Sequence, residues 1–226
     1  MFRIFRKNQL LFFLLGFDVV VILAHFFFKD LYGFFNLDGE QNLNSAYAGL
    51  KLFGIAALAA AQFLILRRAG EGKGKSIVWL LVAAISLYLG LDEMMALHER
   101  VGFVVNNLLG VTNVPGASFR WMQYYAPLIV IALVVYVWFI VSIWREQRTA
   151  AAFILTGILF FICALGIELI GGRIMYPAGL RNGNFSPYFA SIIGEEIVEL
   201  IGMTLFFAGV SHSVHATFRR YFLFRE

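Results

Sequence analysis

Six long apolar runs constrain this chain more than any other feature of its sequence. A helix needs about 20 apolar residues to cross the hydrocarbon core of a bilayer. Only 14% of the residues are charged, whereas a soluble domain carries about 25%. The sequence therefore predicts an all-α, polytopic integral membrane protein, a compact bundle of about six transmembrane helices. The six runs cover about residues 9–28, 46–66, 76–95, 121–144, 150–171 and 187–211.

The runs are expected to belong to one domain. No internal repeat or low-complexity linker divides the chain, so residues 1–226 are predicted to form a single transmembrane helical domain. The basic start "MFRIFRKNQ" resembles a signal peptide, but no small-residue cleavage site follows, and we expect the first span to be retained. The only cysteine, Cys163, lies in an apolar run, which excludes an intrachain disulfide and a CxxC metal motif.

Basic residues are distributed unevenly between the connections, and positive charge favours the cytoplasmic side. We therefore expect a multi-pass protein of the cell membrane with both termini in the cytoplasm. We attribute the net charge of +4 to the basic residues that orient the protein in the membrane, and no nucleic-acid partner is expected. The predicted cytoplasmic set is Arg3, Arg6, Lys7, Arg67, Arg68, Lys73, Lys75, Arg145, Arg148, Arg219, Arg220 and Arg225. The basic residues expected in the outer loops are Lys29, Lys51, Arg100, Arg120, Arg173 and Arg181.

Acidic residues gather in the half of the membrane that faces away from the cytoplasm. The rise of a helix places Asp92 about 25 Å, and Glu168 about 27 Å, from the cytoplasmic ends of their runs. Glu195 lies about 12 Å below the outer end of the last run. We therefore expect seven acidic side chains at overlapping depth in the outer half. They are Asp92, Glu93, Glu99, Glu168, Glu195, Glu196 and Glu199.

The third span cannot continue as one straight helix. A helix over residues 76–109 would be about 51 Å long, far beyond a hydrocarbon core of about 30 Å. We expect a break near Gly90–Glu93, followed by an amphipathic helix on the outer surface. His98 and Glu99 lie off the apolar stripe of this helix and are expected to turn over the acidic site. The stripe consists of Met94, Leu97, Val101, Val104, Val105 and Leu108.

Carboxylates inside a membrane require partners, because an ionised side chain at the bilayer centre costs about 2.5–3.5 kcal/mol on insertion scales. A divalent metal ion would neutralise several of them, and the mixed carboxylate and imidazole set is compatible with Zn, Fe, Mn or Mg. The predicted metal ligands are Asp92, Glu93, His98, Glu168, Glu195, Glu196 and Glu199. The predicted catalytic residues are Glu196, Glu99 and His98, with a carboxylate as the general base.

Three functions fit this pattern. The first is a metal-dependent membrane enzyme that acts on a membrane lipid or another lipid-like, amphipathic substrate. The second is a proton or cation pathway, in which Asp18 at mid-depth would take part, but inner halves such as "KSIVWLLVAAIS" offer almost no polar group. The third is a non-catalytic structural subunit of a membrane complex. A protein partner or a homo-oligomer is compatible with each.

Two further features lead to expectations. Asp18 and His25 are seven residues apart on one face of the first span, and an aspartate at this depth requires a partner or a proton. Aromatic residues near the outer ends of the spans are expected to form an interfacial belt. They are Trp121, Tyr124, Tyr125, Tyr176 and Tyr188.

Overall fold

The computed structural model describes residues 9–28, 34–37, 42–111, 120–172 and 187–223. Within these residues the chain is all-helical. Six helices are long and apolar enough to span a membrane, which confirms the predicted fold class. They are α2 (Gln9–Phe28), α3 (Leu43–Arg68), α4 (Lys73–Met95), α6 (Trp121–Trp144), α7 (Arg148–Ile170) and α8 (Pro187–Phe218). The short α5 (Leu97–Leu108) follows α4, and a π-helical turn, η3 (Arg219–Leu223), extends α8.

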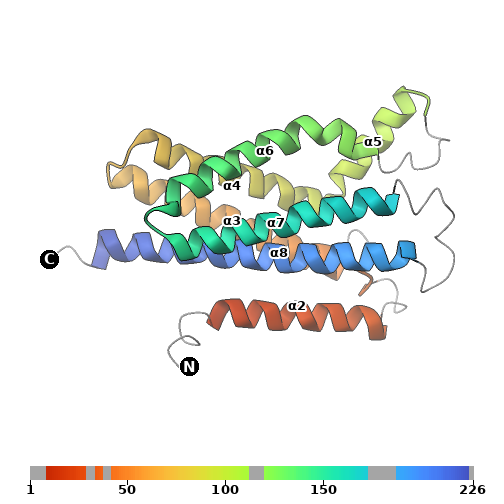
Figure 1. Ribbon diagram of the computed structural model, residues 1–226, viewed down its shortest axis with the longest axis horizontal. Coiled ribbons are helices and arrows are strands. Elements are labelled where there is room, and N and C mark those ends of the chain that lie inside the picture. Colours follow the sequence, from red (N-terminus) through yellow and green to blue (C-terminus); the bar gives the residue numbers. More distant parts are fainter. Residues whose placement is uncertain (1–8, 29–33, 38–41, 112–119, 173–186, 224–226) are drawn as a thin grey trace.

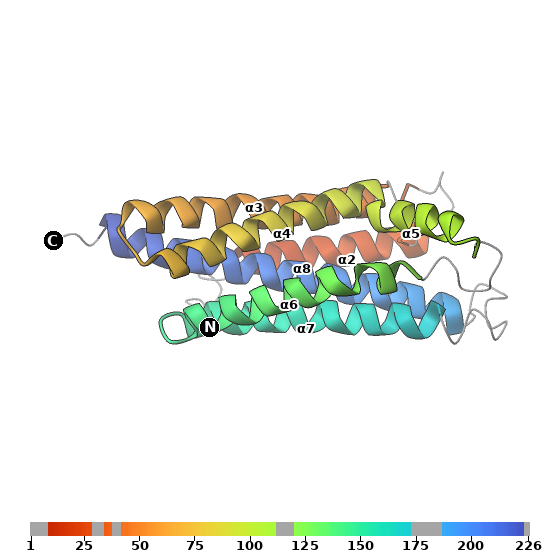
Figure 2. The same cartoon turned by 90° about the horizontal axis from the view of Figure 1, so that it is seen from above.

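Successive long helices run in opposite directions along the bundle. The α3–α4 and α6–α7 turns lie at one end together with the C-terminal end of α8, and α5 lies at the other end (Figure 1). The end that carries α5 is called the α5 end, and the end that carries the two turns is called the opposite end. α8 occupies a central position and packs against α7, α3 and α2 (Figure 2). Of the basic residues used for the orientation, Arg3, Arg6, Lys7, Lys29, Arg173, Arg181 and Arg225 lie outside the described residues.

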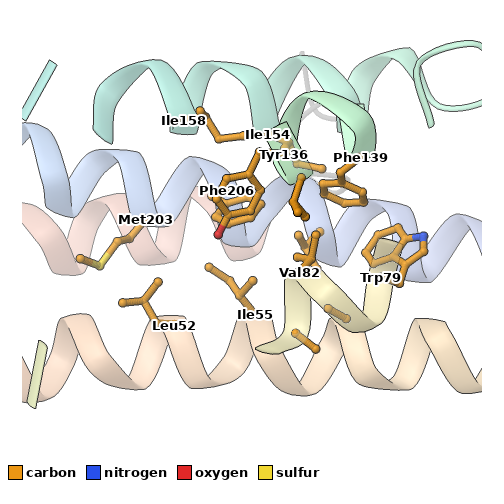
Figure 3. Packing of buried hydrophobic residues seen from close by; sticks show 14 of the residues in the cluster. Leu52, Ile55, Trp79, Val82, Tyr136, Phe139, Ile154, Ile158, Met203 and Phe206 are labelled. Carbon is orange, nitrogen blue, oxygen red and sulfur yellow. The ribbon is translucent and has the colours of Figure 1, made fainter. Parts of the chain in front are cut away.

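Large apolar side chains fill the middle of the bundle between the two ends (Figure 3). The ring of Trp79 packs edge-on against Phe139 with centroids 4.5 Å apart. Tyr136 packs in the same way against Phe206, with centroids 5.4 Å apart. This dense apolar packing joins five of the long helices. Its other labelled members are Leu52, Ile55, Val82, Ile154, Ile158 and Met203.

The outward faces of the long helices are also apolar. Phe27 on α2 is 74% exposed, and Val134 on α6 is 64% exposed. A soluble protein rarely exposes apolar patches of this extent, whereas lipid chains would cover them without an unfavourable free energy. The surface therefore agrees with a multi-pass membrane protein.

α7 and α8 approach each other closely at two glycines. A Cβ atom added to Gly157 would lie 2.7 Å from the carbonyl oxygen of Gly202 and 2.8 Å from the backbone nitrogen of Phe206. Small residues let membrane helices pack backbone to backbone, where van der Waals contact and not water exclusion holds them together. These glycines position the face of α8 that lines the cavity described below.

Lys51 lies buried inside α3, so its assignment to the outer loops was wrong. Its Nζ donates to Asp18 Oδ1 in α2 at 2.8 Å, to the Leu200 carbonyl oxygen at 3.0 Å and to Thr204 Oγ1 at 3.1 Å. Asp18 also accepts hydrogen bonds from the hydroxyls of Tyr47, at 2.9 Å, and Thr204, at 2.6 Å. Lys51 is thus the partner that a buried aspartate requires, and this network joins α2 to α3 and α8.

A separate set of ion pairs connects the turns at the opposite end. Glu146 lies 2.8 Å from Lys75 and 3.0 Å from Arg220. The Tyr221 hydroxyl donates to Glu71, and this bond holds the pKa of the Glu71 carboxyl below its usual range. Exposed pairs of this kind contribute little to stability, so their main effect is to connect the α3–α4 turn, the α6–α7 turn and the end of α8.

Candidate functional site

All of the sequence-predicted site residues line one cavity of about 440 Å³. This volume lies within the range of about 300–1,000 Å³ that is typical of small-molecule sites. The structure thus brings together side chains from α4, α5, α7 and α8. They are Asp92, Glu93, His98, Glu99, Glu168, Glu195, Glu196 and Glu199.

The cavity has two chemically different walls. Most of the acidic side chains come from α4, α5 and α8, whereas α6 and α7 contribute mainly apolar and aromatic side chains. On α8, Glu195 and Glu199 share one face because they are four residues apart. Along α6 the lining extends from Trp121 to Tyr136, about 22 Å of helix. The apolar wall includes Ile129, Ala132, Leu133, Ile158, Phe161, Ile162 and Leu165.

A sharp turn between α4 and α5 places His98 and Glu99 at this cavity. The turn lies at Ala96, just beyond the predicted Gly90–Glu93, and Ala96 adopts a left-handed conformation with φ of +50°. Asp92 Oδ1 accepts a hydrogen bond from the backbone N–H of His98 at 2.7 Å. This bond satisfies one of the N–H groups that the first turn of a helix leaves without an intrahelical partner. Asp92, near the C-terminal end of α4, therefore caps the N-terminus of α5.

The same carboxylate also orients the imidazole of His98. Asp92 Oδ2 lies 3.0 Å from His98 Nδ1. The ring of His98 packs against the indole of Trp121 with centroids 4.4 Å apart. Trp121 Nε1 in turn donates to Glu168 Oε1 at 2.8 Å. A continuous chain of contacts thus connects Asp92 on α4, through α5 and α6, to Glu168 on α7.

The apolar stripe of α5 does not pack against the bundle. Val104 is 54% exposed and Leu108 is 81% exposed. The buried face contains Gly102, which approaches Trp121, and Asn106, which accepts a hydrogen bond from the Tyr124 hydroxyl at 2.7 Å. The side of α5 that carries Gly102 and Asn106 therefore faces the protein, and most of the apolar stripe is turned outward.

Three of the expected belt residues line the cavity, and their place in an interfacial belt stays a prediction. They are Trp121, Tyr125 and Tyr188. Tyr125 accepts a hydrogen bond from the Tyr88 hydroxyl at 2.9 Å. An aromatic residue at the end of a span suits both the interface and a buried wall, and only the rotation of the helix distinguishes the two. Tyr176 lies outside the described residues.

Asn44 is a site neighbour that the sequence reasoning missed. It lies in the first turn of α3, where the side chain of Asn42 accepts from the backbone N–H groups of Asn44, at 2.8 Å, and Ser45, at 3.1 Å. This cap directs Asn44 into the bundle, and Asn44 is only 3% exposed. Its Nδ2 donates to Glu196 Oε2 at 3.1 Å. The sequence feature that could have indicated Asn44 is an amide side chain at the start of an apolar span.

The two polar side chains noted in the first span, Asp18 and His25, lie away from the cavity. Asp18 is bound to Lys51, and neither Asp18 nor His25 lines the cavity. His25 is buried, and its Nδ1 accepts a hydrogen bond from the backbone N–H of Leu37 at 3.0 Å. Both side chains therefore connect α2 to its surroundings and do not extend the site.

The predicted metal ion stays a prediction. Among the residues that the structure describes, no group of three or more histidine, cysteine, aspartate and glutamate side chains is arranged to hold a metal ion. Asp92, Glu168 and Glu196 instead each accept a hydrogen bond from a neighbouring helix.

Comparison with known proteins gives one match. A family model described as "Domain of unknown function (DUF8692)" matches residues 10–214, which include all six long helices almost completely and every residue of the cavity. No curated protein and no solved structure matches the chain.

Proposed function

The chain belongs to the DUF8692 family of unknown function, and we propose that it is a membrane-embedded enzyme acting on a lipid-like, amphipathic substrate. The observation that supports this proposal is the two-sided cavity. An amphipathic molecule would place its polar group against α4, α5 and α8 and its apolar part against α6 and α7. Ligand sites are typically concave and mostly apolar, with a few polar groups that fix the orientation of the ligand.

Asp92 and His98 are suited to general acid–base catalysis. A carboxylate that binds one ring nitrogen holds the imidazole in one orientation and stabilises its protonated form. In the proposed reaction the proton of a water molecule or a substrate hydroxyl would pass to Nε2, the ring nitrogen on the side away from Asp92. Glu99 and Glu196 remain the other candidates for proton transfer, because both line the same cavity.

The proposed enzyme would use a divalent metal ion in addition to these residues. Seven carboxylates around one cavity repel one another, and positive charge would stabilise them. A divalent metal ion such as Zn, Fe, Mn or Mg is one source of this charge. To hold such an ion, the side chains would have to move closer together than they are in this structure.

We further propose that the cavity lies in the outer half of the cell membrane. The described basic residues concentrate at the opposite end, where Arg67, Arg68, Lys73, Arg145 and Arg148 flank the turns. Positive residues favour the cytoplasm, so this end would face the cytoplasm and α5 would lie at the outer surface.

The enzyme proposal is tested by the lipids of a membrane that contains the protein. We expect cells that express the wild-type chain to lose one lipid-like compound and accumulate its product, as measured by mass spectrometry of extracts. His98→Gln should abolish the change, and Asp92→Asn should reduce it at least tenfold because the ring loses its oriented partner. His212→Gln, at the opposite end, is the matched control and should behave as the wild type.

A non-catalytic structural role is the second candidate. It is favoured by the hydrogen bonds that Asp92, Glu168 and Glu196 already make to neighbouring helices. Identical lipid profiles for the wild type and His98→Gln, together with a lower stability of the variant, would support this role against the enzyme. An ion pathway has less support, because the apolar core of Figure 3 lies between the two ends.

A further inference from the structure

We propose that Tyr136 limits the length of the apolar chain that the substrate carries. The inference rests on the proposed function, because it assumes that an amphipathic substrate occupies the cavity, and it adds a residue that selects among such substrates. The chain would extend along α6 and α7 away from the α5 end. It would end against the ring of Tyr136 on α6 and the side chain of Ile158 on α7, both of which line the cavity.

The deepest part of the cavity lies beyond the last carboxylate of α8. Glu199 is the lining residue of α8 that is farthest from the α5 end. On α7, the lining residue Ile158 directly follows Gly157, and Gly157 lies against Gly202 and Phe206 of α8. These two α8 residues follow Glu199 by about 4–10 Å of helix. The cavity therefore continues past the carboxylates into apolar surroundings, which suit the end of a hydrocarbon chain.

Tyr136 marks the place where the cavity ends and the packed core begins. It is the last residue of α6 that lines the cavity, and it is only 7% exposed. Its ring packs against Phe206. One turn further from the α5 end, Phe139 on α6 and Ile154 on α7 are fully buried and do not line the cavity (Figure 3). A chain that grew past Tyr136 would have to displace this core, and overpacking a well-packed core is unfavourable.

The inner face of α6 leads directly to this floor. Tyr125, Ile129, Ala132 and Leu133 line the cavity at spacings of three or four residues, which place them on one face of the helix. Ala132 is the smallest of them and lies one turn from Tyr136 on the side of the α5 end. A larger side chain at residue 132 would shorten the space for a chain, whereas a smaller one at residue 136 would lengthen it. The two positions therefore give opposite predictions.

The test compares straight-chain alkanols from hexanol to octadecanol on the purified full chain in nanodiscs. An alkanol has a neutral head group, so the result does not depend on the charge of the carboxylates. Uptake that depends on the protein is measured by gas chromatography, relative to nanodiscs without protein. We expect the wild type to take up alkanols to a limiting chain length and at least tenfold less of those beyond it.

Variants at the floor should move this limit in opposite directions. Tyr136→Ala should move it to longer chains, and Ala132→Phe should move it to shorter chains. Tyr136→Leu is a milder change that should act in the same direction as Tyr136→Ala, and it decides the result if Tyr136→Ala does not fold. Phe139→Ala is the matched control, because it removes a ring from the core one turn beyond the cavity. It should leave the limit unchanged.

The remaining outcomes separate this inference from the proposed function. Uptake without any limit, or a limit that moves as far in Phe139→Ala as in Tyr136→Ala, would overturn the role of Tyr136 and leave the cavity as the substrate site. Leu133→Trp fills the apolar wall and should abolish uptake at every chain length. Uptake that is the same in Leu133→Trp and in the wild type would contradict the proposed substrate site as well.

Discussion

At the scale of single residues, the buried pair of Asp18 and Lys51 determines how α2 joins the bundle. Every hydrogen-bond donor of the Lys51 ammonium has an acceptor, and both oxygens of Asp18 have donors. A buried ion pair often contributes little net stability, but removal of one partner leaves an uncompensated charge and costs about 3–5 kcal/mol. The pair therefore specifies which helices are neighbours more than it increases stability.

This reasoning predicts the result of a double-mutant cycle. Lys51→Met should lower the unfolding free energy by about 3–5 kcal/mol, because it strands the charge of Asp18. The double variant with Asp18→Leu should lose less than Lys51→Met alone, since no buried charge remains. Thermal unfolding in detergent measures all four states of the cycle. Losses that simply add would show that the two side chains act independently.

At the scale of elements, the contact between α7 and α8 depends on glycine. Gly157→Ala places a Cβ atom against backbone atoms of Gly202 and Phe206, which cannot rotate away as a side chain can. We expect a loss of about 1–3 kcal/mol in stability, as for other overpacked contacts, and a lower Tm in detergent. Gly166→Ala is the control in the same helix, because a Cβ there would meet nothing within 4 Å. Equal Tm values for both variants would contradict the close approach.

At the scale of the whole molecule, the direction of the bundle across the membrane can be tested. Gly70 lies in the α3–α4 turn and Gly110 follows α5, at opposite ends of the bundle (Figure 1). Reporter fusions at these two positions should report opposite sides of the membrane, with residue 70 in the cytoplasm because of its basic neighbours. The same side for both fusions would contradict the outer location of the site.

Most of the fold was predictable from the sequence. The ends of the long helices mostly agree with the apolar runs because a membrane helix must satisfy its backbone internally over the whole hydrocarbon thickness. The exception is α8, which continues to Phe218, beyond the predicted end at about residue 211. The positions of Asp92, Glu168 and Glu195 along their helices followed from the rise per residue alone. The need for a turn after the third span followed from length, but its position at Ala96 did not. That position depends on the reach of the Asp92 side chain to the backbone of His98.

The sequence by itself determined the number of long helices and the position of each acidic residue along its helix, because length and helical rise depend only on the local chain. Only the tertiary structure decided which side chains of different helices meet. It paired Lys51 with Asp18, placed Trp121 between His98 and Glu168, and directed Asn44 to Glu196. These contacts depend on the rotation of each helix about its axis and on its neighbours. Both are set by packing between segments far apart in the chain, such as the close contact of Gly157 with Gly202.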